Sequence, residues 1–406
     1  MRRRFLLLPC LLLLGAAPTG RLEIQERSGN SFRGSIDGFP LLMLKGTHRE
    51  RGEAHGRLEA AAILSLLDDA LIPTMHKFAA GAWERKYVPE AAGFAFPARY
   101  DEELAGMLDG IRAALPAKED RTLKSLKREI GVGDLKALNC LSDIFGSGCS
   151  SFSAWGARTA DGTPIVGRNL DYFAFPVSSK ALLLASEPAE KGLRATVDVL
   201  MPGYIGAGTG LNADGAFLAL HDEKGLPGSA KSGWVPRSLA LRTALETASG
   251  ASAVQDIASA LRDLPVRMGN NVHVCGVAGP SAVLEWDGNP KDHGVTARGP
   301  EGRDTLVCTN HYCLRENTGG GPDSGSRFSK VSGGLDALGA ADRKLDLDVA
   351  KKLLEGVSRS GPVVTHLSIV VWPAARRWTF AVSPQTGVSA TKGRWIALEW
   401  KDVFAN

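Results

Sequence analysis

The sequence has little net charge and few cysteines, and each shortage argues against a class of function. A formal net charge of +4, dispersed over 406 residues, does not favour a nucleic-acid-binding protein. The 6 cysteines show no zinc-type spacing and there is no Walker-type phosphate loop. Residues 206–210 (Gly-Ala-Gly-Thr-Gly) lack the third glycine of the dinucleotide fingerprint and lead into a strand-like run. We therefore expect no cofactor, no metal and no nucleic-acid partner.

Long hydrophobic runs are also missing, apart from one at the start of the chain. Three arginines at residues 2–4 precede an apolar stretch at 5–14, and residues 15–17 are small. This is the pattern of a secretory signal peptide, and ten apolar residues are too few to cross a bilayer comfortably. We expect residues 1–20 to be a signal peptide and the protein to be exported, to the periplasm or outside the cell. An uncleaved membrane anchor is the alternative.

The cysteine count is odd once the predicted signal peptide is set aside. In an exported protein, five cysteines leave at least one thiol outside any disulfide, and Cys149 is the natural candidate. The other four could form up to two disulfides, in a pairing that the sequence does not specify. Cys275 and Cys308 lie in apolar strand-like runs, where a buried free thiol would fit as well as a disulfide. The four are Cys140, Cys275, Cys308 and Cys313.

The local pattern changes at Cys149 from helical to β-rich. Before it, residues 40–45 read as a strand and residues 49–86 carry apolar side chains near the helical period. Asp101 and Asp134 are the predicted N-caps of two further helices that end near residues 115 and 145. After it, short β-rich runs separated by Asp-Gly and Gly-Pro turns alternate in places and are fully apolar in others. That mixture is typical of sheets covered on both faces.

The most informative segment is residues 148–172. A glycine-rich break at 146–148 stands directly before Cys149, and Arg168 and Asp171 return toward it on the second arm of a predicted hairpin. A thiol beside fixed charges of both signs is the arrangement of an activated nucleophile. Taken singly, these residues would more often be a structural cysteine and a surface ion pair. Their order and the helix break favour the catalytic interpretation.

This segment, with residues 203–215 and 309–312, resembles the amide-hydrolysing branch of the N-terminal nucleophile hydrolases. That branch includes penicillin V acylase, conjugated bile acid hydrolase, acid ceramidase and the acyl-coenzyme A:6-aminopenicillanate acyltransferase relatives. The resemblance implies an α+β fold with four layers, αββα. It also implies a precursor that cuts itself between Gly148 and Cys149. Residues 21–148 would then be a helical α-chain or pro-segment and residues 149–406 the catalytic β-chain, in a monomer or a homo-oligomer.

Cutting before Cys149 would give that residue a free α-amino group with a pKa near ~8, which can act as a general base near neutral pH. No histidine beside it is then required. Gly148 suits the cut because it has no Cβ to shield its carbonyl.

The resemblance also implies roles for four other residues. Arg168 would favour the thiolate and Asp171 would orient the amine. Asn310 would stabilise the tetrahedral oxyanion. Arg327 resembles the second active-site arginine, in competition with Arg303 and Arg315.

The spacing of the hairpin raises one difficulty. A two-residue turn at Asp161 and Gly162 would pair Asp171 with Phe152, about 10 Å along the strand from Cys149. We therefore expect a bulge or a wider turn between Cys149 and Asp161.

The resemblance implies hydrolysis of linear, non-peptide amides such as N-acyl amines, penicillins or bile-acid conjugates, or transfer of their acyl group. Aromatic residues around the site suggest a small-molecule amide with an apolar acyl group as the partner. They are Phe152, Trp155, Tyr172, Phe173, Phe175 and Tyr204.

Two other functions stay open. One is a papain-like exported cysteine protease that pairs Cys149 with His293 or His311, although Ser150 stands where such enzymes have Trp or Tyr. The other is a catalytically silent exported binding protein on the same fold.

Overall fold

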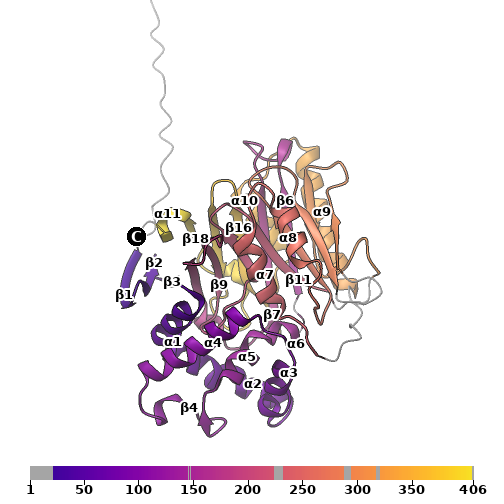
Figure 1. Cartoon of the computed structure of the whole chain (residues 1–406). Helices are drawn as coiled ribbons and strands as arrows, with labels where there is room; N and C mark the ends of the chain where they lie inside the picture. The colour runs from indigo at the N-terminus through magenta and orange to yellow at the C-terminus, as the bar shows by residue number, and fades with distance from the viewer. Residues whose placement is uncertain are drawn as a thin grey trace, which may run out of the picture.

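Two β-sheets stacked face to face form the middle of the molecule (Figure 1). The structure is a computed structural model, and it describes residues 22–144, 146, 148–223, 232–287, 294–316 and 321–404. The expected signal peptide therefore lies outside the described residues.

The larger sheet has ten strands in the order β1-β2-β3-β8-β9-β10-β11-β12-β13-β14. All neighbours are antiparallel except β3 and β8, which run parallel. The strands are β1 (Leu22–Ser28), β2 (Ser31–Ile36), β3 (Phe39–Gly46), β8 (Leu182–Pro188), β9 (Thr196–Leu200), β10 (Thr209–Asn212), β11 (Phe217–Asp222), β12 (Asn270–Cys275), β13 (Ala282–Asp287) and β14 (Gly294–Arg298).

The smaller sheet has six antiparallel strands in the order β15-β6-β7-β16-β17-β18. Its central hairpin is the one that carries Cys149, Arg168 and Asp171. The strands are β6 (Gly148–Ala154), β7 (Ile165–Phe173), β15 (Thr305–Cys308), β16 (Val363–Trp372), β17 (Arg377–Val382) and β18 (Ile396–Glu399).

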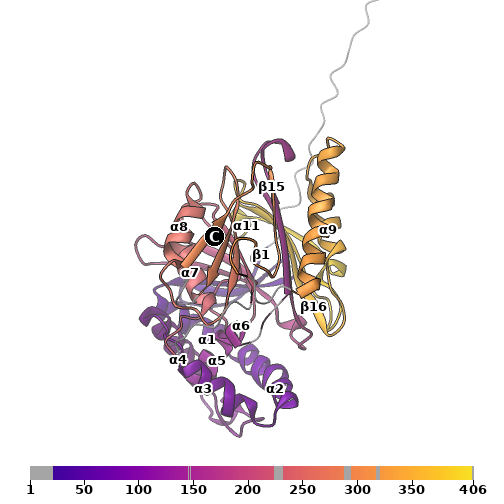
Figure 2. The same ribbon diagram turned by 90° about the vertical axis from the view of Figure 1, so that its right-hand side faces the viewer.

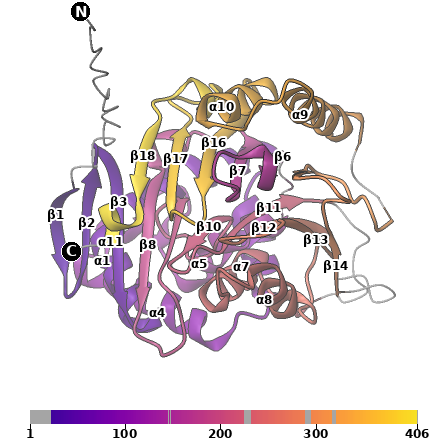
Figure 3. The ribbon, with the colours of Figure 1, turned by 90° about the horizontal axis from the view of Figure 1, so that it is seen from above.

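Helices cover the outer face of each sheet. Figures 2 and 3 show α7 (Arg237–Thr247) and α8 (Ala253–Leu261) on the larger sheet, and α9 (Gly321–Ala340) and α10 (Leu347–Gly356) on the smaller one. Apolar side chains from both sheets, such as Phe217 and Ile369, fill the space between them. The expectation of an αββα sandwich is thus confirmed. The alternation of side chains along each strand produces it, because one face meets the other sheet and one meets helices.

The segment before Cys149 forms a further helical layer at one end of the sheets (Figure 1). It contains α1 (His48–Ser65), α2 (Ile72–Phe78), α3 (Val88–Ala92), α4 (Ala98–Ala114), α5 (Val132–Asn139) and α6 (Leu141–Ile144), which share a core of their own. The segment is less purely helical than expected, since β1, β2 and β3 belong to it. Through the β3–β8 pairing it is built into the larger sheet.

Two helix starts differ from the prediction by about one turn. The N-caps are Pro97 and Gly131, not Asp101 and Asp134. Asp134 acts from inside the first turn, where its carboxylate accepts the backbone N–H of Gly131 at 2.8 Å. For Asp134 the prediction was wrong because an acidic residue at the third helical position also accepts the backbone N–H of the N-cap residue. The expected third helix is also divided into α5 and α6.

Candidate active site

Cys149 is the second residue of β6, close to the point where the chain leaves the helical layer. Its side chain is fully buried, and its backbone N–H donates to Asn310 Oδ1 at 2.7 Å. Along β6, Phe152 and Ala154 pack under α9 and α10, whereas Ser151 and Ser153 face the larger sheet and contact His273 of β12. By the two-residue period of a strand, Cys149 also points between the sheets.

The register of the hairpin brings the charged residues to Cys149. Asp171 pairs with Gly148, Cys149 with Leu170, and Ser151 with Arg168. The strands are joined by residues 155–164, which include a short 3-10 helix, so the expected wider connection is confirmed. Because opposite residues share a face, Arg168 lies on the side of the Cys149 thiol. Asp171 lies on the other face, beside the backbone of Gly148.

Arg168 is buried and held on three sides. Its guanidinium donates to the hydroxyl of Thr209 and to the carbonyl of Leu220, and Nη2 lies 3.5 Å from Cys149 Sγ. A fixed guanidinium this close to sulfur favours the thiolate over the thiol.

Asp171 is fully buried on the α10 side of the sheet. Its Oδ1 accepts the Thr365 hydroxyl at 2.6 Å, and its Oδ2 lies 3.4 Å from Nε of Arg359. Burial raises the pKa of Asp171 to about 6, against the opposing effects of the Thr365 hydrogen bond and of three nearby arginines. The β7–β16 pairing shifts by one residue between Thr365 and Leu367. Such a bulge re-aims side chains, and here it accompanies the Thr365 contact.

Asn310 and Arg327 reach Cys149 from the other side. The Asn310 Oδ1 that accepts the Cys149 amide also accepts Arg327 Nη2 at 2.9 Å, and Asn310 Nδ2 donates to the Asp222 carbonyl at 2.7 Å. Arg327 Nη1 donates to the Cys149 carbonyl and, at 2.8 Å, to the Ser150 hydroxyl. All five sequence-predicted site residues therefore meet around one peptide bond.

The two competing arginines lie elsewhere. Arg303 is exposed and pairs with Asp336, and Arg315 donates to backbone carbonyls of Glu285 and Gly294.

Of the two histidines in the protease alternative, only His311 lies in the part of the chain that the structure describes, and the contacts of its ring there do not include the Cys149 thiol. His311 Nδ1 contacts Thr309 and Ser324, and its ring packs against Phe328. His293 lies outside the described residues.

An apolar cavity of about 200 Å³ adjoins the hairpin. Arg168, which contacts Cys149, and Leu170 line it, and its wall combines the sheets with the helical layer. Three of the six aromatic residues near the site line it, namely Tyr172, Phe175 and Tyr204. Phe152 and Trp155 belong to other core clusters, and Phe173 is exposed.

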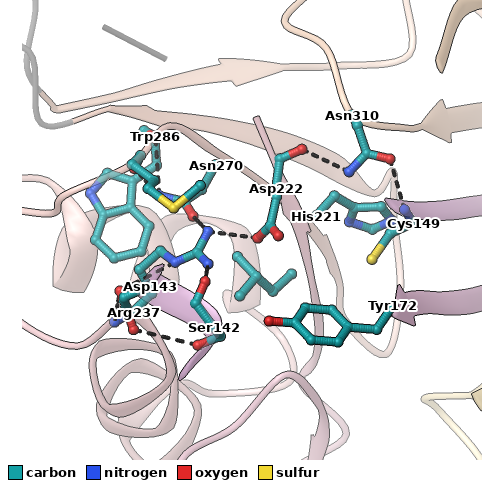
Figure 4. A network of polar contacts seen from close by, with 12 residues as sticks. Ser142, Asp143, Cys149, Tyr172, His221, Asp222, Arg237, Asn270, Trp286 and Asn310 are labelled. Carbon is teal, nitrogen blue, oxygen red and sulfur yellow. Dashed lines mark hydrogen bonds and ion pairs between the residues drawn. The ribbon is translucent and has the colours of Figure 1, made fainter. Parts of the chain in front are cut away.

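A buried ion network that sequence reasoning missed fixes one wall of this cavity (Figure 4). Arg237 of α7 pairs with Asp222 at 2.6 Å and with Asp143 of α6 at 3.3 Å, and it donates to Asn270. Burial raises the pKa of Asp143 to about 6, with Arg237 opposing the shift. The network joins the helix just before the 148–149 bond to strands β11 and β12. Its members are spread over the sequence without a motif.

Within the described ranges, no group of three or more His, Cys, Asp and Glu side chains is arranged to hold a metal ion. None of the helices in that part of the chain is long and apolar enough to cross a membrane. Cys140, Cys275, Cys308 and Cys313 form no disulfide among the described residues.

The chain matches the profile of one protein family, acyl-coenzyme A:6-aminopenicillanic acid acyl-transferase, over residues 158–369. This is just over half of its length. Arg168, Asp171, Asn310 and Arg327 lie inside the matched region, and Cys149 lies shortly before it. No curated protein sequence matches the chain.

Solved structures with a similar arrangement include three hydrolases. An N-acylethanolamine-hydrolyzing acid amidase ortholog from Caenorhabditis elegans is 19% identical over 61% of this chain and 99% of that one, with a TM-score of 0.42. A conjugated bile acid hydrolase mutant from Clostridium perfringens is 13% identical over 62% and 92%, with a TM-score of 0.43. Penicillin V acylase from Agrobacterium tumefaciens is 14% identical over 62% of this chain and 91% of that one, with a TM-score of 0.41.

The four layers, αββα, are the fold of the N-terminal nucleophile hydrolases. Within that class, the chain belongs to the acyl-coenzyme A:6-aminopenicillanic acid acyl-transferase family.

Proposed function

We propose that this protein is an exported, self-processing cysteine amidohydrolase that acts on linear, non-peptide amides with an apolar acyl group. The observation that carries the proposal is the environment of one peptide bond. Gly148 pairs with Asp171, and the Cys149 thiol lies 3.5 Å from Arg168 beside an apolar cavity. Signal-peptide removal and the cut at Gly148 would leave an α-chain ending at residue 148 and a β-chain beginning at Cys149.

Self-processing uses the thiol on its own chain. Cys149 Sγ attacks the Gly148 carbonyl carbon, the C–N bond breaks, and the thiol proton passes to the departing nitrogen, which becomes the α-amine. Water then hydrolyses the resulting thioester and restores the thiol. Asn310 already accepts the Cys149 amide N–H of the bond that is cut, and Arg327 donates to the Cys149 carbonyl, so both residues hold Cys149 in place before the cut.

Turnover of an external amide repeats the chemistry with a different base. The Cys149 α-amine takes the thiol proton and passes it to the leaving amine. Asn310 Nδ2, which donates to the Asp222 carbonyl in the uncut chain, turns to the oxyanion. The acyl group occupies the cavity. Its thioester with Cys149 is then hydrolysed, or the acyl group is transferred to an acceptor amine.

The two chains would stay associated after the cut, because buried ion pairs join them besides the β3–β8 pairing. Glu103 of α4 accepts from Arg242 of α7 at 2.8 Å and contacts His48 Nδ1 at 2.6 Å. Burial alone would raise the pKa of Glu103, but Arg242 and the His48 hydrogen bond lower it to about 2. The pair therefore remains ionised across the physiological range.

Amino-terminal sequencing of the purified protein, combined with an activity panel, tests the proposal. We expect a new amino terminus at Cys149 and hydrolysis of at least one class among N-acyl amines, bile-acid conjugates and penicillin V. An active protease with an intact 148–149 bond would support the papain-like alternative. An uncut, inactive chain would support the binding protein.

Narrowing the cavity should change the preferred acyl length. Ala181 lines the cavity, and Ala181→Phe would place a ring where an acyl chain is expected to lie. Loss of burial for two methylenes is worth about 0.8 kcal/mol each, so kcat/KM for long acyl chains should fall on the order of tenfold. Short acyl amides should be affected within about threefold. The matched control is Ala341→Phe at an exposed position. Equal losses of kcat/KM for long and short substrates would show that the acyl group does not bind in this cavity.

A further inference from the structure

Asp171 has a cationic neighbour that the sequence pattern did not indicate. Arg359 lies in the connection between α10 and β16, and its Nε is 3.4 Å from Asp171 Oδ2. Thr365 fixes this connection, because its hydroxyl accepts the Arg359 backbone N–H at 2.8 Å while donating to Asp171 Oδ1. The same strand bulge that presents Thr365 therefore also positions Arg359.

The Asp171–Arg359 pair lies directly on the residue whose carbonyl would be attacked. A Cβ on Gly148 would be 3.8 Å from Asp171 Oδ2 and 3.9 Å from Arg359 Cζ. Among the described residues, Asp171 Oδ2 accepts no hydrogen bond, although it is buried. A buried carboxylate oxygen normally has a donor, so this one is poised for a donor that the described residues of the uncut chain do not supply.

Cutting the 148–149 bond creates such a donor. In the uncut chain the Cys149 nitrogen is an amide that donates to Asn310. After the cut it is an amine that becomes an ammonium, next to a carboxylate that already has Arg359 as counter-ion. Arg359 has another partner within reach, because Nη2 also pairs with the exposed carboxylate of Asp323.

We propose that Arg359 is a positioning residue that acts as the counter-cation of Asp171 in the uncut chain. When the bond is cut, the Cys149 α-ammonium replaces Arg359 as the ion-pair partner of Asp171, and Arg359 then pairs with Asp323 alone. This proposal depends on the self-processing proposed above.

Other charged groups around Asp171 have other commitments. Arg168 on β7 points to the opposite face and contacts the thiol, and Arg327 on α9 is bonded to the Cys149 carbonyl and to Asp323. Arg359 is thus the cation best placed to keep Asp171 ionised before the α-amine exists. Asp171 must be ionised to accept the amine as it forms, since a neutral carboxyl would not stabilise an ammonium.

This exchange of counter-ions predicts that removal of Arg359 slows the cutting of the 148–149 bond but changes the turnover of external amides little. Without Arg359, the pKa of Asp171 should rise above its present value of about 6, because burial would act with less opposition. Loss of a nearby opposite charge moves such a pKa by about 1–3 units. Below that pKa Asp171 is protonated and cutting is slow, and cutting recovers as pH rises. In the processed enzyme the α-ammonium is itself the counter-ion, so turnover should change little.

The test compares Arg359→Met with Arg359→Lys and with Arg343→Met, an exposed arginine. Full-length chains made by cell-free synthesis are followed on denaturing gels from pH 5 to 9, and kcat is measured on material processed to completion at pH 9. We expect Arg359→Met to be cut on the order of tenfold more slowly at pH 7, with its pH midpoint raised by at least one unit. Its kcat should stay within about threefold of the parent, Arg359→Lys should restore much of the rate, and Arg343→Met should match the parent.

Each outcome bears on one proposal. An unchanged midpoint in Arg359→Met, with the parent cut normally, would overturn the exchange and leave self-processing intact. Equal losses in cutting and in kcat would assign Arg359 a structural role and also overturn the exchange. A parent that is never cut before Cys149 would instead refute the proposed function. Circular dichroism identifies an Arg359→Met variant that does not fold. In that case the pH midpoint of cutting in Arg359→Lys, compared with that of the parent, decides between the outcomes.

Discussion

The Cys149→Ala variant is expected to remain a single uncut chain with no amidase activity. The methyl group cannot attack the Gly148 carbonyl, so neither the thioester nor the α-amine can form. The fold should persist, because the β6–β7 pairing and the Asn310 contact to the backbone N–H of residue 149 do not depend on sulfur. Denaturing gels, amino-terminal sequencing and an amide assay read out the three consequences.

Cys149→Ser tests the nature of the nucleophile. Its hydroxyl can attack, but it is far less ionised than a thiol near neutral pH even beside Arg168. We expect slow or incomplete cutting and poor hydrolysis. A chain that is still cut before residue 149 in the alanine variant would disprove self-processing by this thiol.

Cys275→Ala is the matched control. Cys275 is as deeply buried as Cys149, in a strand of the other sheet, and burial raises the pKa of its thiol to about 12. It has no guanidinium among its described contacts, so its removal should leave cutting and turnover unchanged. The contrast separates loss of the nucleophile from loss of a buried sulfur atom.

Two groups of residues in the candidate site differ in how far sequence could find them. Cys149, Arg168 and Asp171 lie on one hairpin, and a local motif with the right charges places them together. The register is harder to predict, because residues 155–164 form a connection wider than the Asp-Gly pair suggests. A shift of one residue would have exchanged the faces of Arg168 and Asp171.

Arg237, Asp222 and Arg359 form the second group. They reach the site through pairings between distant strands, such as β7 with β16, and through a helix packed on the larger sheet. No spacing in the sequence records these contacts. The four-layer fold followed from the family resemblance and from fully apolar strands, whereas the inclusion of β1–β3 in the larger sheet depends on the parallel β3–β8 pairing. That contact joins residues far apart in the chain, so local pattern could not indicate it.

The contacts of Asn310 lead to the second large effect. Asn310 uses its Oδ1 to hold Cys149 and Arg327, and its Nδ2 is the group that can turn to a developing oxyanion. Asn310→Ala removes both functions. Loss of one preorganised oxyanion donor lowers kcat by about 10²–10³, and we expect a loss of that order for an external amide.

Asn310→Asp divides the two functions of this side chain. It keeps an oxygen that can accept from Cys149 and Arg327, and it lacks the donor. If Nδ2 stabilises the oxyanion, the aspartate variant should be cut before Cys149 yet lose about as much kcat as the alanine variant, measured on fully processed chains. A kcat within about twofold of the parent in Asn310→Ala would move the oxyanion role to another residue. A large loss in Ala but not in Asp would show that Asn310 acts by holding the nucleophile and Arg327 in place, because only the acceptor oxygen would then matter.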